Sequence, residues 1–254
     1  VIKNNSLEYD SLTIMETGKS ITPNFYLQKM YQKYIDGTGI DSLVSEVVRI
    51  YEDSHRQNTY ENLSMEYEDC IEKIVMRLIS LNKNKKLLED MPYIRFLDMA
   101  VVFYCLVSND EDGIASIRIT NEVAKEWQTD TRELYTLALK NSERIFEEKI
   151  MPMSEVIGMF DVQLQEMGLK KPELKRECLY EPYVVTNNMG INGASVILYQ
   201  DIFKRLAEKI GGDFYILPSS IHEVLAMSAK AGLTKEELKN MVKEVNDNCL
   251  LPDE

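Results

Sequence analysis

The chain has 254 residues, of which 44% are apolar and 28% are charged, a composition typical of an ordinary globular protein. Its 42 acidic and 29 basic residues give a formal net charge of −13, which repels phosphate backbones and argues against nucleic acid as a partner. No apolar run approaches the ~18–20 residues that span a bilayer, so the sequence also predicts no membrane partner.

The four cysteines are sparse and follow no metal-binding pattern. They lie at positions 70, 105, 178 and 249, and neither a CxxC nor a CxH spacing occurs. We therefore expect no metal site and no cofactor. Because free thiols without a disulfide framework are typical of a reducing compartment, the cysteines predict a cytoplasmic protein.

The first third of the chain predicts a short hairpin and then helices. The hairpin would pair residues 1–4 with residues 11–15. Thr22-Pro23 is a helix start signal, and the helix that follows would end at Asp36-Gly37. A second helix would open at Asp41.

Apolar residues continue at helical spacing after Asp41. In the second helix they are Leu43, Val44, Val47 and Ile50. A third and longer helix would carry Tyr67, Ile71, Ile74, Val75 and Leu78. The pattern thus predicts a mainly helical region over residues 22–90, packed in part by its tyrosines.

The sequence changes character at Pro92. Residues 94–120 are rich in β-branched and aromatic side chains and contain a turn signal at 109–113, which predicts two antiparallel strands. Helices are expected over 121–127 and 130–146, the second opened by Asp130 with Glu133 three residues later. Another helical pattern runs from Met153 towards Gly168.

The last third of the chain predicts strands at both ends of a helix. Strands are expected over 182–187, 194–199, 214–218 and 224–228. The helix over 201–210 would stop at Gly211, and a capping box of Thr234 and Glu237 would open the final helix. The prediction is one co-folded α+β unit over 1–254, whose helical N-terminal region precedes a mixed, mainly antiparallel sheet flanked by helices over 92–254.

The segment PSSIHE, residues 218–223, gathers polar groups behind an apolar strand. His222-Glu223 begins like a zinc-protease HExxH, but position 226 is alanine, so the second imidazole is missing. No GxSxG surrounds either serine. Ser220 and Glu223 fit a capping box, and Pro218 would end the strand. We therefore interpret the segment as a turn between strands and assign no catalytic residue.

The segment NMGING, residues 188–193, has two glycines without GxGxxG or P-loop spacing, which favours a hairpin connection over a phosphate site. If the strands before these two segments are neighbours, their polar side chains would converge into a ligand pocket. The candidate contacts, in addition to Thr186, are Asn187, Asn192, Ser219, Ser220, His222 and Glu223.

Strings spread over nearly the whole chain resemble an uncharacterised Firmicutes family found in gut clostridia, often on mobile elements. They are VIKNN, ITPNFYL, YIRFLDMAVVFYCL, RELYTLALKN, YVVTN, INGASVILY and DFYILPSSIHEVLAMS, the last with the signature LPSSIHEV. The resemblance implies a single co-folded unit in the bacterial cytoplasm and a possible mobile-element setting. It carries no activity and no site residue.

Two functions follow from these patterns. The first is a non-enzymatic interaction protein whose acidic surface or sheet edge meets a protein partner. The alternative is a small-molecule binder or hydrolase that uses a pocket near residues 186–193 and 218–223.

Overall fold

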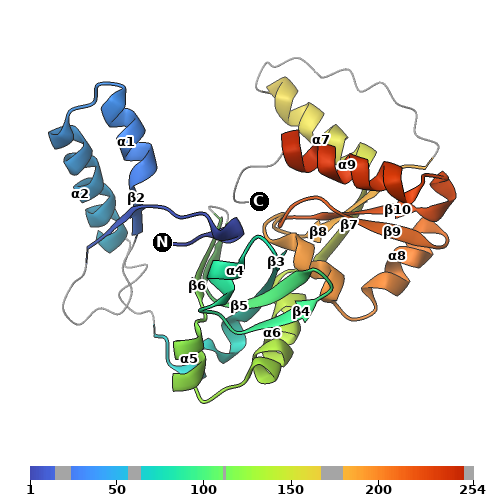
Figure 1. Ribbon diagram of the computed structural model, residues 1–254, viewed down its shortest axis with the longest axis horizontal. Coiled ribbons are helices and arrows are strands. Elements are labelled where there is room, and N and C mark those ends of the chain that lie inside the picture. The colour runs from blue at the N-terminus through green and yellow to red at the C-terminus, as the bar shows by residue number, and fades with distance from the viewer. Residues whose placement is uncertain (15–23, 57–63, 111–112, 167–179, 249–254) are drawn as a thin grey trace.

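The computed structural model describes residues 1–14, 24–56, 64–110, 113–166 and 180–248. This part of the chain is α+β, as the sequence predicts. Two helices near the N-terminus precede two four-stranded antiparallel sheets (Figure 1). None of the described helices is long and apolar enough to cross a membrane.

The N-terminal strands pair differently from the prediction. Strand β1 (Ser11–Thr13) pairs with β2 (Asn24–Tyr26), so the expected hairpin of residues 1–4 with 11–15 is wrong. Ile2 instead forms a single bridge to Glu8, around the 3-10 helix η1 (Asn4–Ser6). The start signal at Thr22-Pro23 lies outside the described residues.

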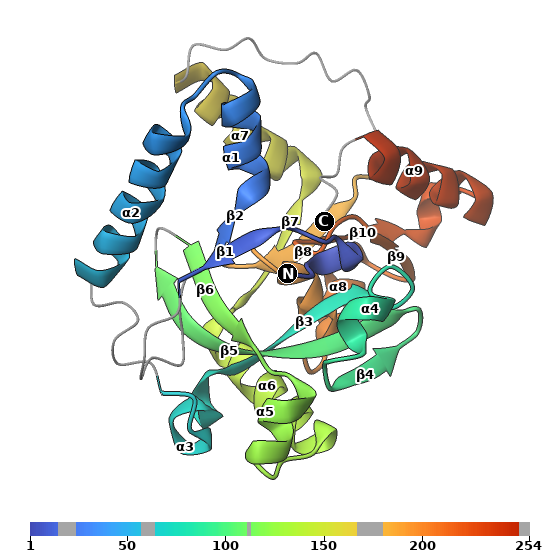
Figure 2. The same cartoon turned by 60° about the vertical axis from the view of Figure 1, so that its left-hand side comes forward.

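Helices α1 (Leu27–Ile35) and α2 (Ile40–Arg56) form an antiparallel pair joined by a short turn at Asp36-Gly37. The end of α1 and the extent of α2 agree with the prediction, but α1 begins only at Leu27, and residues 24–26, expected in the helix, form β2. Phe25, Leu43 and Val47 are buried near the seam of this pair, with exposed fractions of 6%, 9% and 8%. In both views α2 stands away from the two four-stranded sheets (Figures 1 and 2).

The third predicted helix is wrong over most of its length. After the short α3 (Tyr67–Cys70) and η2 (Ile71–Lys73), the chain enters strand β3 (Ile74–Ser80). β3 is buried on both faces, so its apolar residues do not alternate with polar ones and mimic helical spacing. Its register places Ile74 opposite Cys105 and Ser80 opposite Met99.

The first sheet is built around the long strand β5 (Met99–Asp110). β3 pairs with β5 along one edge, and β4 (Tyr93–Phe96) and β6 (Gly113–Arg118) pair with β5 along the other. The predicted hairpin is β5–β6, and β4 is an additional strand. Helices α4 (Lys85–Leu88), α5 (Asn121–Glu126) and α6 (Thr131–Ile145) accompany this sheet.

The N-terminus of α6 is capped as the sequence predicts. The Asp130 side chain accepts hydrogen bonds from the backbone N–H groups of Arg132 and Glu133, both at 2.8 Å. These bonds satisfy donors that the first helical turn cannot pair internally.

The second sheet has the strand order β7–β8–β10–β9. Its strands are β7 (Glu148–Pro152), β8 (Tyr183–Asn187), β9 (Phe214–Pro218) and β10 (Val224–Ser228). β7 was not predicted. The predicted strand over 194–199 is wrong, because residues Gly193–Leu198 form the buried 3-10 helix η3. Asn192 directly before it has a φ of 55°, which turns the chain out of an extended path.

Helices cover both faces of the second sheet. Helix α8 (Ile202–Ile210) ends at Gly211 as predicted, and α9 (Lys235–Asn248) is opened by the predicted Thr234–Glu237 capping box. The remaining elements are α7 (Met153–Glu166) and η4 (Ala229–Ala231). Figure 1 shows α7 and α9 over one face of this sheet.

The largest buried cluster draws side chains from both four-stranded sheets. Phe103 of β5, Val185 of β8 and Leu206 of α8 belong to it, and each has an exposed fraction of 0%. Helix α6 and η3 contribute further buried members. The strand ends that carry the predicted polar corner are therefore anchored to this core.

Candidate functional site

The structure brings the two predicted polar segments together. Strands β8 and β10 are antiparallel neighbours, with Val185 opposite Val224. The segment after β8 therefore meets the loop before β10. The Thr186 hydroxyl donates to the His222 carbonyl at 2.7 Å, and the Asn192 backbone N–H donates to His222 Nδ1 at 3.1 Å.

The side chains of Asn187, Ser219 and Glu223 also bond to their own chain. The Asn187 amide donates to the Ile191 carbonyl at 2.9 Å, and its oxygen accepts from the Met189 N–H at 3.0 Å. The Ser219 hydroxyl donates to the Glu223 carboxylate at 2.8 Å. These bonds hold two turns in shape, one after β8 and one before β10, at the same end of the pair.

The expected capping box of Ser220 and Glu223 does not form. The Ser220 hydroxyl accepts from the His222 N–H at 2.9 Å, two residues on, and strand β10 follows instead of a helix. The segment is thus a loop of the β9–β10 hairpin, in which Pro218 pairs with Val224.

The space beside this polar corner is small. A cavity lined in part by Asn187, Asn192 and Ser195 measures about 10 Å³. A single water molecule needs ~10–15 Å³ on this measure, so a metabolite does not fit there in this conformation. Ligand contact by the corner residues stays a prediction, and the hydrogen bonds favour a structural role.

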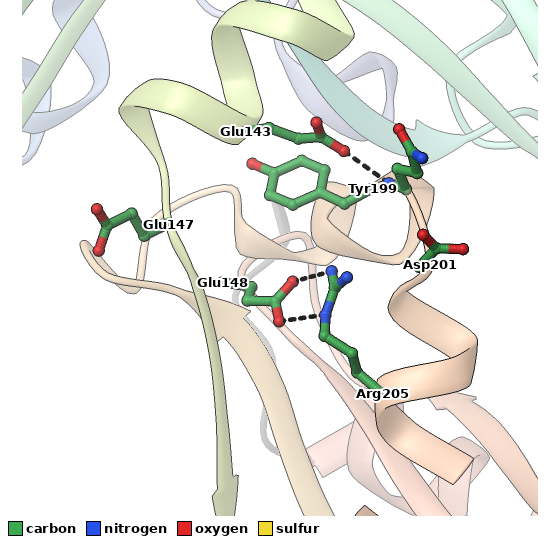
Figure 3. Close-up of a pocket in the computed structure, with 7 residues that line it drawn as sticks. Glu143, Glu147, Glu148, Tyr199, Asp201 and Arg205 are labelled. Atoms are coloured by element: carbon green, nitrogen blue, oxygen red, sulfur yellow. Dashed lines mark hydrogen bonds and ion pairs between the residues drawn. The ribbon is translucent and has the colours of Figure 1, made fainter. Parts of the chain in front are cut away.

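A larger pocket of about 480 Å³ lies between the end of α6, strand β7 and the start of α8 (Figure 3). Its lining residues are mainly acidic or polar: Glu143, Glu147, Glu148, Tyr199, Gln200, Asp201 and Arg205. The sequence prediction did not include it, because these residues come from three separate elements and form no local motif.

Several polar groups of this pocket are already paired. Arg205 forms a two-pronged ion pair with Glu148, with Nε at 2.6 Å from Oε1, and this carboxylate raises the pKa of Arg205. Glu143 accepts from the Gln200 backbone N–H at 2.6 Å. In Figure 3 Glu147 lies apart from both. The carboxylates therefore do not face one another as an acid–base pair.

Tyr199 is a structural group rather than a proton donor for chemistry. Its hydroxyl oxygen lies 3.0 and 2.9 Å from the carbonyl oxygens of Ser142 and Phe146, which share its one hydrogen, and the residue is 5% exposed. Burial raises the pKa of Tyr199, and the charges of Glu143 and Glu148 add to the effect. Among the described residues, no group of three His, Cys, Asp or Glu side chains could hold a metal ion.

A different kind of site lies on the α1–α2 pair. Six large apolar side chains are 45–65% exposed there. They are Tyr31, Tyr34 and Ile35 of α1 and Ile40, Val44 and Val48 of α2, and we call them the α1–α2 face. On α2 they recur every four residues, which places them along one stripe of the helix.

The two halves of this face lie on the same side of the pair. Lys33 of α1 and Glu46 of α2 form an ion pair across the helices, with Nζ at 2.6 and 2.8 Å from the two carboxylate oxygens. Residues two positions apart point about 200° apart on a helix. Tyr31 is two positions from Lys33, and Val44 is two positions from Glu46. The buried Leu43 and Val47 lie between Glu46 and Val44 around α2, so the ion pair flanks the seam on one side. We infer that Tyr31 and Val44 flank it on the other side.

The α1–α2 face is large for a protein surface. Taking roughly 200 Å² for each full side chain, six of them at about half exposure leave on the order of 600 Å² of apolar area in water. The largest patch on an ordinary monomer is about 300–600 Å² and is often functional, so the α1–α2 face reaches the upper end of that range.

The sequence prediction missed this face because it assigned the apolar residues of both helices to internal packing. Leu43 and Val47 are buried as expected, whereas Val44 is 54% exposed. The sequence did contain a signal, because the apolar residues of α2 cover a wider arc around the helix than one packing partner needs. Ile40, Val44 and Val48 add a second stripe beside Leu43 and Val47, which one antiparallel neighbour cannot cover.

The fold and these sites define an α+β protein with a paired polar corner, an acidic pocket and an apolar helical face. The whole chain, residues 1–254, matches a family of unknown function (DUF5688), and the protein belongs to that family. No curated protein and no solved structure matches the chain.

Proposed function

We propose that the protein is a non-enzymatic interaction protein that binds a helical segment of a partner protein on the α1–α2 face. The observation that supports this function is the exposure of six large apolar side chains on one side of two helices. Transferring such area out of water is favourable by roughly 25 cal/mol per Å², so covering it supplies a driving force for association.

The shape of the face favours a helical partner. Two antiparallel helices present a shallow groove between them, and a third amphipathic helix packs into it with apolar residues at i, i+3, i+4 and i+7. Val44 of α2 and Tyr31 of α1 would flank such a helix. A standard interface buries ~800 Å² on each side, so the apolar face would form the centre and polar residues the rim.

Charge favours a different protein over a second copy of this chain. Each copy carries a formal charge of −13, which keeps like copies apart. Asp36 and Asp41 flank the turn beside the face. A partner helix with lysine or arginine beside its apolar stripe would complement them. From the clostridial resemblance we expect this partner in the bacterial cytoplasm.

The test is photo-crosslinking from single positions of the full chain in its host cells. A photoreactive phenylalanine analogue at Val44 or Tyr31 is expected to link the same partner. The same analogue at Ser42, about 200° from Val44 on α2, is the matched control and is expected to link nothing reproducibly. A crosslink from Val44 to a second copy of this chain, or equal products from Ser42, would contradict the proposal.

A second step measures affinity with the purified partner. The double variant Ile40→Asp, Val44→Asp is expected to raise Kd well over tenfold relative to the wild type, since two carboxylates would be buried unpaired at the apolar centre of the interface. An unchanged Kd in this double variant would place the binding site elsewhere.

A further inference from the structure

Strand β9 is the outer strand of the second sheet, and its free edge is unusually apolar. The sheet order ends at β9, which pairs with β10 in the described part of the chain. Its sequence FYILP contains no charged residue. Natural edge strands are commonly protected by lysines, bulges or prolines, and β9 has only Pro218, at its end.

The alternation of the β9–β10 ladder shows which backbone groups are directed outwards. The Ala229 N–H donates to the Asp213 carbonyl at 2.8 Å, and Met227 pairs with Tyr215 two residues on. In an antiparallel ladder every second residue directs its N–H and C=O towards the partner strand. The intervening residues Phe214 and Ile216 therefore direct both groups away from β10.

A groove of about 340 Å³ runs beside this edge, between β9 and α9. Its walls include Tyr215 and Leu217 of β9 and Leu238 and Val242 of α9. Leu217 and Leu238 belong to one buried cluster, so the floor of the groove is continuous with packed apolar side chains. Figure 1 shows α9 lying over the β9–β10 end of the sheet.

The α9 wall of the groove is positively charged in an otherwise acidic protein. Lys235 and Lys239 both line it, one helical turn apart. Lys239 Nζ lies 3.6 Å from Glu236, an ion pair in which both side chains are more than 70% exposed and which therefore holds the lysine weakly. Two lysines at the rim favour an acidic ligand.

We propose that an extended, acidic segment of another protein adds to β9 as a fifth strand. Its backbone would pair with the outward N–H and C=O groups of Phe214 and Ile216. Alternate apolar side chains would enter the groove towards Leu238 and Val242, and its carboxylates would meet Lys235 and Lys239. This site is separate from the α1–α2 face and does not depend on it.

The probe is a fluorescein-labelled eight-residue peptide of alternating leucine and glutamate, titrated with the full chain by fluorescence anisotropy. The matched peptide carries lysine in place of glutamate. We expect the acidic peptide to bind at least about tenfold more tightly, and to lose affinity as salt screens the lysines. In hydrogen exchange, the amide of Ile216 is expected to become protected when the peptide binds.

Paired variants locate the binding. Lys235→Glu combined with Lys239→Glu is expected to weaken the acidic peptide about tenfold or more. The control combines Lys125→Glu on α5 with Lys204→Glu on α8, which changes net charge equally and is expected to leave Kd within about twofold.

Three outcomes of the peptide experiments would overturn the proposal. They are equal binding of the two peptides, an Ile216 amide whose exchange does not change, and equal weakening by the control variant. Protection of Ile216 that rises with protein concentration in the absence of peptide would also overturn it, since a second copy would then occupy the edge.

Discussion

Replacing Gly193 with alanine tests whether the polar corner is built to bond the protein's own main chain. A Cβ atom at Gly193 would lie 2.2 Å from Thr186 Oγ1, 2.5 Å from the His222 carbonyl oxygen and 2.7 Å from the Asn187 nitrogen. Two of these are backbone atoms, which cannot rotate away: the Asn187 backbone nitrogen lies in the β7–β8 ladder, and the His222 carbonyl is bonded by Thr186.

The expected loss of stability follows from these distances. Relieving an overpacked contact of this kind costs ~1–3 kcal/mol, and displacing Thr186 from the His222 carbonyl removes a hydrogen bond worth ~1 kcal/mol. Gly193→Ala should therefore lower the free energy of unfolding by about 2–4 kcal/mol. At ~2–4 °C per kcal/mol for a chain of this size, Tm should fall by roughly 4–16 °C.

Thermal and urea unfolding followed by circular dichroism measure this loss. Gly190→Ala is the matched control, because Gly190 has a φ of +65° but open space around it. That variant should cost only the ~1–2 kcal/mol of left-handed backbone strain. A Gly193→Ala protein within about 0.5 kcal/mol of the wild type would refute the packing argument, since surface substitutions stay within that range.

Three further predictions concern stability. Val47→Asp should lower the free energy of unfolding by at least about 3 kcal/mol because Val47 is 8% exposed, whereas Val44→Asp, at 54% exposure, should change it by less than about 0.5 kcal/mol; urea titration compares the two. Folding raises the pKa of Tyr199, so its contribution to the free energy of unfolding is fully present below the unfolded-state pKa of ~10 and is lost as pH rises through the folded-state pKa. Tyr199→Phe should therefore reduce the loss of stability seen in unfolding curves measured from pH 8 to 12. Since the main buried cluster joins both sheets, calorimetry should show one transition with equal calorimetric and van't Hoff enthalpies, and two separated transitions would contradict a single co-folded unit.

Elements with local signals could be predicted from the sequence. Asp130 and Thr234 open α6 and α9 through their caps, and Gly211 ends α8, because these signals act within one helical turn. The β9–β10 hairpin was predictable for the same reason, since Pro218 and the serines after it mark a turn.

Elements defined by tertiary burial could not be predicted in this way. The mainly apolar segment Ile74–Ser80 fits a helix and a strand buried on both faces equally well. It forms a strand because it pairs with β5, which lies far from it in the sequence. Residues Gly193–Leu198 are mostly apolar and include the β-branched Val196 and Ile197, yet close contacts of Gly193 with β8 and the 219–223 loop hold them in a 3-10 helix.

The candidate site was predictable in its position but not in its chemistry. The sequence placed Asn187 and His222 near each other on the condition that their strands are neighbours, and β8 does pair with β10. Whether their polar atoms face a ligand or the main chain depends on backbone and side-chain torsion angles, which the spacing of residues in the sequence does not determine. The α1–α2 face was missed because the exposure of Val44 depends on which elements pack against α2, and the sequence of α2 alone does not show this.

The affinity of the crosslinked partner for two single variants tests the central claim most directly. Val44→Asp and Ser42→Asp each add one negative charge to α2, on opposite sides of the helix. If the α1–α2 face is the binding surface, Val44→Asp raises Kd at least about tenfold, while Ser42→Asp leaves it within about twofold. Equal Kd values for the two variants would contradict the account.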